Sequence, residues 1–194
     1  MNTTSTDKPE LRKILRQRRN ELSAEAQGVA AEAISHHIAG LPEWHSAKQI
    51  ALYHDADCEI GTGPLLAACL NAGKTVYLPV VRDNKTLEFA HWYPEQHTQV
   101  NQYGITEPGA SAARVAAAEL DLVFLPLVGW DQFGNRLGMG AGYYDRALAR
   151  HPRVLKVGLA HSFQEVDEIP SDAWDIALDV VLTETGIHRC SHAV

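Results

Sequence analysis

The chain has little cysteine, no long apolar run and no excess of basic charge. Its three cysteines, Cys58, Cys69 and Cys190, share no C-x-x-C spacing and follow no N-terminal apolar stretch, so neither a disulfide framework nor secretion is indicated and a cytoplasmic location is expected. Pro, Asp or Gly interrupts the apolar runs before they reach the roughly 18 to 20 residues that span a bilayer, which excludes a membrane protein. The net charge of -7 argues against a protein that binds nucleic acid through its overall field.

What the chain does have is an ordinary globular composition. A length of 194 residues with 45% apolar side chains is enough to bury the core of one domain, expected over residues 1–194. Residues 1–7 are polar and are expected to be disordered. We expect a monomer that binds a small molecule.

The first helix is predicted from Lys8, with Pro9 in its first turn. Leu11, Ile14, Leu15 and Leu22 recur at helical spacing and predict an amphipathic helix. Its other face carries a strongly basic cluster in an otherwise acidic chain: Lys8, Arg12, Lys13, Arg16, Arg18 and Arg19. Such a cluster is typical of a solvated helix face, and it could also serve as an RNA-binding arm.

Short β-like segments then alternate with helical ones. Strands are predicted over residues 49–54, 75–80, 87–92, 120–128, 154–160 and 178–184, and helices over residues 24–38, 64–72 and 142–151, with a short helix in an alanine-rich stretch before Glu119. Continuous apolar strands that alternate with helices are typical of a mostly parallel sheet covered on both faces. The sequence therefore predicts a single three-layer α/β/α domain with a Rossmann-like open sheet.

A glycine-rich loop follows the most apolar predicted strand. In "RLGMGAGYYDR", residues 136–146, glycines stand at alternate positions and would let backbone N–H groups approach a phosphate closely. The spacing fits neither G-x-x-x-x-G-K-[ST] nor G-x-G-x-x-G, so the loop is neither a Walker loop nor a dinucleotide fingerprint. A glycine-rich packing turn is the simpler alternative.

Charged and aromatic side chains around this loop favour a ligand. Arg136 could hold phosphate oxygens through two hydrogen bonds, and Asp145 could hold a divalent cation beside them. Their plain alternatives are a solvated loop charge for Arg136 and a helix-dipole partner for Asp145. Tyr143 and Tyr144 could belong to the core or to the wall of a planar ligand's pocket.

The stretch "PLVGWDQFGNRLGMGAGYYDR" resembles the motif D-x-x-G-x-R-L-G-x-G-x-G-Y-Y-D of the 5-formyltetrahydrofolate cyclo-ligase family. Three further stretches agree in order and spacing: "KPELR" at residues 8–12, "YHDADCEIGT" at 53–62 and "YGITEP" at 103–108. The resemblance covers nearly the whole chain. It implies an ATP- and Mg²⁺-dependent ligase that converts a reduced folate, 5-formyltetrahydrofolate, to 5,10-methenyltetrahydrofolate with release of ADP and phosphate.

The resemblance also implies a role for particular residues. The ATP site would consist of Lys8, Pro9, Glu10, Leu11, Arg12, Arg136, Leu137, Gly138, Met139, Gly140, Ala141, Gly142, Tyr143 and Tyr144. Of these, Lys8 and Arg136 would be catalytic. The folate would contact His54, Glu59 and Tyr103, and the magnesium carboxylates would be Asp145 and Asp179. Ala141 stands where some members carry a lysine, so Arg136, Lys8, Arg12 or main-chain N–H groups must make that phosphate contact.

Two other functions remain open from the residues themselves. One is a different phosphate-binding α/β enzyme, such as a sugar-phosphate isomerase, which would need neither ATP hydrolysis nor Mg²⁺. The other is an RNA-binding module that uses the basic helix, which predicts salt-sensitive affinity for RNA and no nucleotide turnover.

Overall fold

The computed structural model describes residues 7–82 and 85–191, so the expected disorder of residues 1–6 lies outside the described range. Within that range the main sheet has eight strands in the order β12-β11-β10-β7-β1-β2-β3-β6. Their bounds are β1 Gln49–Ala51, β2 Thr75–Val81, β3 Leu87–Trp92, β6 Arg114–Val115, β7 Leu122–Pro126, β10 Leu155–Leu159, β11 Val180–Thr183 and β12 Gly186–Arg189. Two-residue and three-residue strands form the separate pairs β4 (Thr98–Val100) with β5 (Thr106–Pro108) and β8 (Gly129–Trp130) with β9 (Arg136–Leu137).

The centre of the main sheet is parallel, as predicted. β11, β10, β7, β1 and β2 run in one direction. β12 at one edge, and β3 with β6 at the other end of the sheet, pair antiparallel with their neighbours. The central strands are buried on both faces, which explains their continuous apolar sequences. The predicted mixed, mostly parallel α/β architecture is therefore confirmed.

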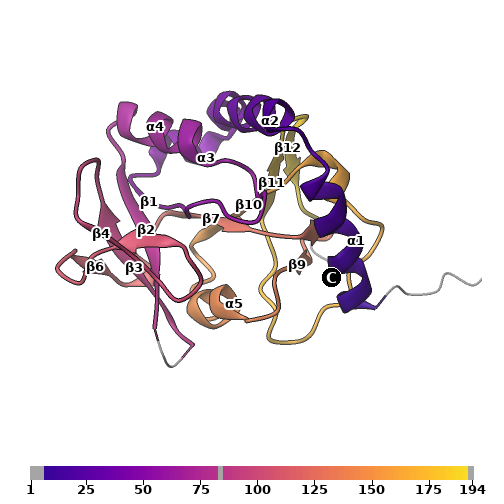
Figure 1. Ribbon diagram of the computed structural model, residues 1–194. Coiled ribbons are helices and arrows are strands. Elements are labelled where there is room, and N and C mark those ends of the chain that lie inside the picture. The colour runs from indigo at the N-terminus through magenta and orange to yellow at the C-terminus, as the bar shows by residue number, and fades with distance from the viewer. Residues whose placement is uncertain (1–6, 83–84, 192–194) are drawn as a thin grey trace, which may run out of the picture.

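Helices lie on both faces of this sheet (Figure 1). One face is covered by α2 (Ala24–His37), the 3-10 helix η1 (Ile38–Gly40), α3 (Pro42–Ser46) and α4 (Gly63–Asn71), and the other by α5 (Tyr143–Leu148). Alternate residues of one strand serve the two layers, because successive side chains point to opposite faces. In β7, for example, Leu122 and Phe124 pack under α2 and α4, whereas Val123 and Leu125 pack on the side of α5.

The first helix, α1 (Lys8–Asn20), lies beside the ends of the strands rather than on a sheet face (Figure 1). Leu15 is buried with Val128, Leu137 and Ile169, in a small core separate from the two sheet layers. The helix thus rests on the segment that follows β7, which is the segment that holds the glycine-rich loop. No helix in the described part of the chain is long and apolar enough to cross a bilayer.

Several predicted elements are longer than those in the structure, including the strand predicted over residues 49–54, which ends at Ala51. α5 ends at Leu148, three residues before the predicted end at His151, and the alanine-rich stretch forms only the 3-10 helix η2 (Ala117–Glu119) after β6. The remaining short helix is η3 (Ser162–Gln164). High helix propensity in so short a stretch does not outweigh the costly nucleation of an α-helix.

Candidate active site

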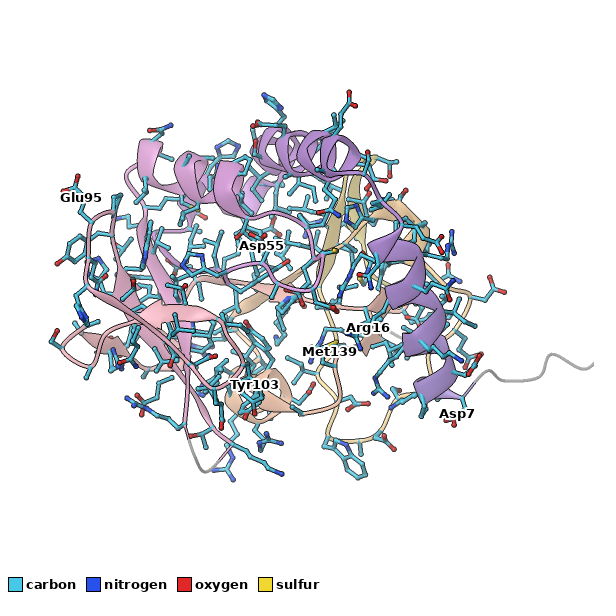
Figure 2. All side chains as sticks on the ribbon, in the orientation of Figure 1. Asp7, Arg16, Asp55, Glu95, Tyr103 and Met139 are labelled. Carbon is cyan, nitrogen blue, oxygen red and sulfur yellow. The ribbon has the colours of Figure 1, made fainter. Side chains whose placement is uncertain are left out.

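A cavity of about 1170 Å³ lies at the carboxyl ends of the parallel strands. Leu127 after β7, Tyr53 after β1 and Pro79 near the end of β2 contribute to its wall. In Figure 2, Met139 lies between Tyr103, beside α5, and Arg16 on α1. Small-molecule sites usually measure roughly 300 to 1,000 Å³, so this cavity has room for more than one ligand.

The glycine-rich loop forms one wall of the cavity. It leaves the short β8–β9 hairpin and enters α5 at Gly142, whose φ of 67° lies in the left-handed region. Gly140 has a φ of 94°, and a Cβ there would lie 3.7 Å from the Arg12 guanidinium carbon. Glycine at these two positions therefore permits a backbone that other residues would strain.

Arg136 and Asp145 form an ion pair within this loop. Arg136 Nη2 donates to Asp145 Oδ1 at 2.7 Å, and the two side chains are only 6% and 18% exposed. Arg136 Nε is buried without a hydrogen-bond partner among the described residues. A buried guanidinium with an unused donor has capacity left for an anion, because an unpaired buried N–H is costly.

Two cations of α1 reach the same cavity. Lys8 Nζ lies 3.1 Å from Asp172 Oδ2 and 3.2 Å from Asp175 Oδ2, and both carboxylates line the cavity. Arg12 Nε donates to the carbonyl oxygen of Gly138 at 2.8 Å, so this contact does not neutralise the charge of the arginine. The glycine-rich loop and the first helix therefore bring three basic side chains, Lys8, Arg12 and Arg136, to one cavity.

Three further polar side chains line the same cavity. The Tyr53 hydroxyl is buried and has no hydrogen-bond partner among the described residues, and burial raises its pKa well above the usual value. Burial likewise raises the pKa of Tyr144, and it raises the pKa of Glu59 to about 7. All three side chains line the cavity, where they offer donors and an acceptor to a polar, largely neutral ligand.

The raised pKa of Glu59 makes stability depend on pH. The folded protein binds this proton more tightly than the unfolded chain does, so the contribution of Glu59 to stability falls as pH rises from about 4.5 to about 7. We expect Glu59→Gln to be more stable than the wild type at pH 8, by on the order of 1 kcal/mol for a half-buried carboxyl, and to match it at pH 5. Urea unfolding at the two pH values measures this, and an equal difference at both would contradict it.

Two further aromatic residues stand at the cavity. His54 is half-buried, packs edge-on against Trp92 with ring centroids 6.2 Å apart, and has its pKa lowered by burial. The hydroxyls of Tyr103 and Tyr143 lie 2.8 Å apart. Tyr103 belongs to the loop between β4 and β5, so this hydrogen bond joins that loop to the start of α5.

Most of the predicted site residues line this one cavity. They are Lys8, Arg12, His54, Glu59, Tyr103, residues 136–144 without exception, and Asp145. Pro9 lines a shallow groove alongside α1, Leu11 packs into the small core under that helix, and Glu10 is exposed. The glycine loop and the first helix thus meet, as the family resemblance implies.

Asp179 is not brought to the cavity. It directly precedes β11, and its Oδ2 accepts from the backbone N–H of Lys156 at 2.8 Å, at the start of β10. This is the amino end of both strands, whereas the cavity lies at the carboxyl ends. The two predicted magnesium carboxylates, Asp145 and Asp179, therefore do not share a wall of the cavity.

Sequence reasoning missed the acidic loop before β11. Asp172 and Asp175 line the cavity beside Lys8, and the Ile176 backbone N–H donates to Asp145 Oδ1 at 3.2 Å, which brings this loop against the glycine loop. Trp174, 70% exposed, also borders the cavity. The only signal for these residues was their residue types in "SDAWD", since no periodicity relates them to a helix more than 160 positions earlier in the chain.

The fold and site together define an α/β enzyme with a cavity across the carboxyl ends of a parallel sheet, lined by basic, acidic and uncharged polar side chains. The family model of the 5-formyltetrahydrofolate cyclo-ligases matches residues 4–184. The chain belongs to this family and is an enzyme of this type.

Individual relatives agree over nearly the full length. The chain is 38% identical to the 5-formyltetrahydrofolate cyclo-ligase of Haemophilus influenzae, over 94% of this chain and 99% of that protein. It is 35% identical to that of Escherichia coli K12, over 90% and 98%. An NMR structure of Aquifex aeolicus 5,10-methenyltetrahydrofolate synthetase superimposes with a TM-score of 0.83 at 36% identity, over 96% of this chain and 94% of that one. A 5,10-methenyltetrahydrofolate synthetase from Mycoplasma pneumoniae gives a TM-score of 0.76 at 27% identity, over 92% and 99%.

Proposed function

We propose that the protein closes 5-formyltetrahydrofolate to 5,10-methenyltetrahydrofolate at the expense of ATP, which leaves as ADP and phosphate. The observation that carries the proposal is the large cavity lined by two chemically different groups of side chains. One group is Lys8, Arg12 and Arg136, which suit a polyphosphate and define the proposed nucleotide side of the cavity. The other group is Tyr53, Glu59 and Tyr144, which suit the hydrogen-bonding edge of a pterin-like ring.

The acidic side chains that lie near Lys8 and Arg136, Asp145 and Asp175, suit Mg²⁺. Carboxylate oxygens are hard ligands, and Mg²⁺ in nucleotide enzymes is commonly held by one or two carboxylates together with substrate phosphates. Asp145, in the first turn of α5, and Asp175, in the loop before β11, line one cavity, and the Ile176 backbone N–H donates to Asp145 Oδ1. Among the described residues no group of three or more His, Cys, Asp or Glu side chains forms a ready-made metal cluster, which agrees with an ion that enters with the nucleotide. Bound there, Mg²⁺ would neutralise phosphate charge.

The chemistry needs activation of the formyl group, because a formamide oxygen is a poor leaving group. The formyl oxygen attacks the γ-phosphorus of ATP and ADP departs, which leaves an imino-phosphate on the folate. The neighbouring folate nitrogen, N10, attacks the formyl carbon, loses its proton, and expels phosphate as the five-membered ring closes. Nucleophile and leaving group both belong to the substrates.

The protein's part is therefore to position and to stabilise charge. Arg136, freed from Asp145 by the nucleotide, can donate to the transferring phosphoryl group, and Lys8 and Arg12 can hold the remaining phosphates. Glu59 in its ionised form can accept hydrogen bonds from the folate ring, while His54 and Tyr103 border the same ligand. The cavity wall from Leu127 to Tyr144 keeps the two substrates adjacent.

The test is direct. Purified protein is mixed with 5-formyltetrahydrofolate, ATP and Mg²⁺, and the absorbance of the methenyl product is followed near the visible edge. We expect product only when all three are present, with one ADP formed per product, and no signal after chelation of Mg²⁺. Folded protein that forms no product under these conditions would overturn the proposal.

The two alternative functions have less support. An RNA-binding arm requires free basic side chains on α1, but Lys8, Arg16 and Arg19 are paired with carboxylates and Arg19 is fully buried. A sugar-phosphate isomerase would use one phosphate site and a small cavity, whereas this cavity is large enough for two ligands. No observation in the described residues favours either one over the ligase.

A further inference from the structure

The last basic residue of α1 is buried beneath the cavity. Arg19 is 0% exposed, and its Nη2 donates to Asp57 Oδ2 while its Nη1 donates to the carbonyl oxygen of Leu127 at 3.3 Å. A fully buried arginine is costly unless it is paired, and breaking such a pair from one side leaves an uncompensated charge. The buried guanidinium of Arg19 is therefore fixed against Asp57, in the loop that follows β1.

That loop has an unusual backbone. Asp57 and the next residue, Cys58, are non-glycine residues with φ values of 51° and 56°, in the left-handed region. Such a conformation costs about 1 kcal/mol or more for each residue and persists only where surrounding contacts hold it. The contacts that hold Asp57 come from α1: Arg19, and Arg16 through two hydrogen bonds of 2.9 Å.

The strained turn carries a cavity residue. Glu59 follows Cys58 directly, and the turn closes on itself, since the Glu59 N–H donates to the Ala56 carbonyl at 2.9 Å and the Ala56 N–H donates to Glu59 Oε2 at 3.2 Å. The position of Glu59 in the cavity thus depends on the conformation of residues 56–58. That conformation in turn depends on α1, the helix that also carries Lys8 and Arg12.

We propose that the Arg19–Asp57 ion pair is a positioning device. It orients Glu59 toward the reduced folate and fixes the position of Glu59 relative to the nucleotide side of the cavity. One rigid helix then carries the contacts of both halves: Lys8 and Arg12 toward the phosphates, and Arg19 toward the loop of Glu59. This inference rests on the proposed function, because it assigns the Glu59 side of the cavity to folate. Arg19 and Asp57 act through Glu59 and touch neither reacting atom.

A purely structural role is the competing explanation, and the choice of variant separates the two. Asp57→Asn removes the charge but keeps a residue type that tolerates the left-handed conformation, so it tests the pair without adding backbone strain. Arg19→Met removes the cation with a similar volume, and Arg19→Lys keeps the charge without the planar fork. Arg18→Ala is the matched control, because Arg18 is an exposed cation of the same helix whose guanidinium lies over the Phe163 ring.

The experiment measures the KM for 5-formyltetrahydrofolate and the KM for ATP separately, together with kcat. We expect Asp57→Asn and Arg19→Met to raise the folate KM about tenfold or more and to change the ATP KM less than threefold. The double variant should be no worse than either single one, because both remove the same pair. Arg19→Lys should recover part of the loss, and Arg18→Ala should stay within twofold of the wild type.

Several results would overturn the inference. The first is an unchanged folate KM in folded Asp57→Asn protein, and the second is a rise of both KM values together in proportion to lost stability. If Arg19→Met fails to fold, Asp57→Asn alone carries the test. A wild-type protein that makes no methenyl product would instead refute the proposed function, so the two failures are distinguishable.

Discussion

Replacing Arg136 with methionine should lower kcat for methenyl formation by a factor of roughly 30 to 1000, which corresponds to about 2 to 4 kcal/mol of lost transition-state stabilisation. The reason is that Arg136 is the most buried cation on the nucleotide side, only 6% exposed, and has one donor unused. Charge on a transferring phosphoryl group is stabilised most strongly where water is excluded. The measurement is kcat at saturating ATP and folate.

The ion pair with Asp145 complicates a simple reading of this variant. Arg136→Met also leaves the Asp145 carboxylate without its partner, so stability must be measured beside turnover. Arg136→Lys keeps the charge and should retain more activity than Arg136→Met, though less than the wild type, because lysine lacks the planar fork of donors that a guanidinium has. Arg153→Ala, which removes an exposed charge, is the control for net charge. Near-normal turnover of folded Arg136→Met protein would contradict the assignment.

Removal of the acidic residues should separate two possible magnesium sites. We expect Asp145→Asn and Asp175→Asn each to reduce kcat about 100-fold and to raise the Mg²⁺ concentration needed for half-maximal rate. The reason is that the hydrogen bond from Ile176 to Asp145 joins the first turn of α5 to the loop of Asp175, and both carboxylates line the cavity. The titration of turnover with Mg²⁺ at fixed ATP is the measurement.

Asp179→Asn is the matched comparison. The family resemblance implies a metal role for Asp179, but the carboxylate lies at the amino ends of β10 and β11, where it accepts a hydrogen bond from Lys156. We expect this variant to change stability more than the Mg²⁺ requirement, with kcat within about threefold of the wild type. An Asp179→Asn enzyme as impaired as Asp145→Asn, with the same shift in Mg²⁺ dependence, would restore the original prediction.

The parallel core could be predicted because its signal is local and repeated. Continuous apolar runs such as 120–128 are typical of strands buried on both faces, and the structure confirms β7 within that run. Short elements could not be predicted in this way. β8 and β9 have two residues each, too few for any period, yet they start and direct the glycine loop.

The candidate site likewise contains residues that a local sequence pattern identifies and residues that depend on distant contacts. The glycine loop and Arg136 could be predicted because glycines at fixed offsets and a charge between them form a contiguous motif. The basic face of α1 was interpreted as solvated, but Arg19 on it is fully buried, because helical spacing identifies a face and not what covers that face. Asp172 and Asp175 depend on a contact across more than 160 positions, and nothing in the neighbouring residues indicates it.

The contacts that α1 makes with residues far along the chain also affect how the protein folds. Its side chains meet partners 108, 126 and 164 positions further along the chain, at Leu127, Gly138 and Asp172. Contacts between such distant residues form late in folding, because a long loop must close before they gain anything. The helix is synthesised first, but the contacts of Lys8 can form only after Asp172 and Asp175 have been added to the chain. We therefore expect the proposed nucleotide side of the cavity to be completed late in folding.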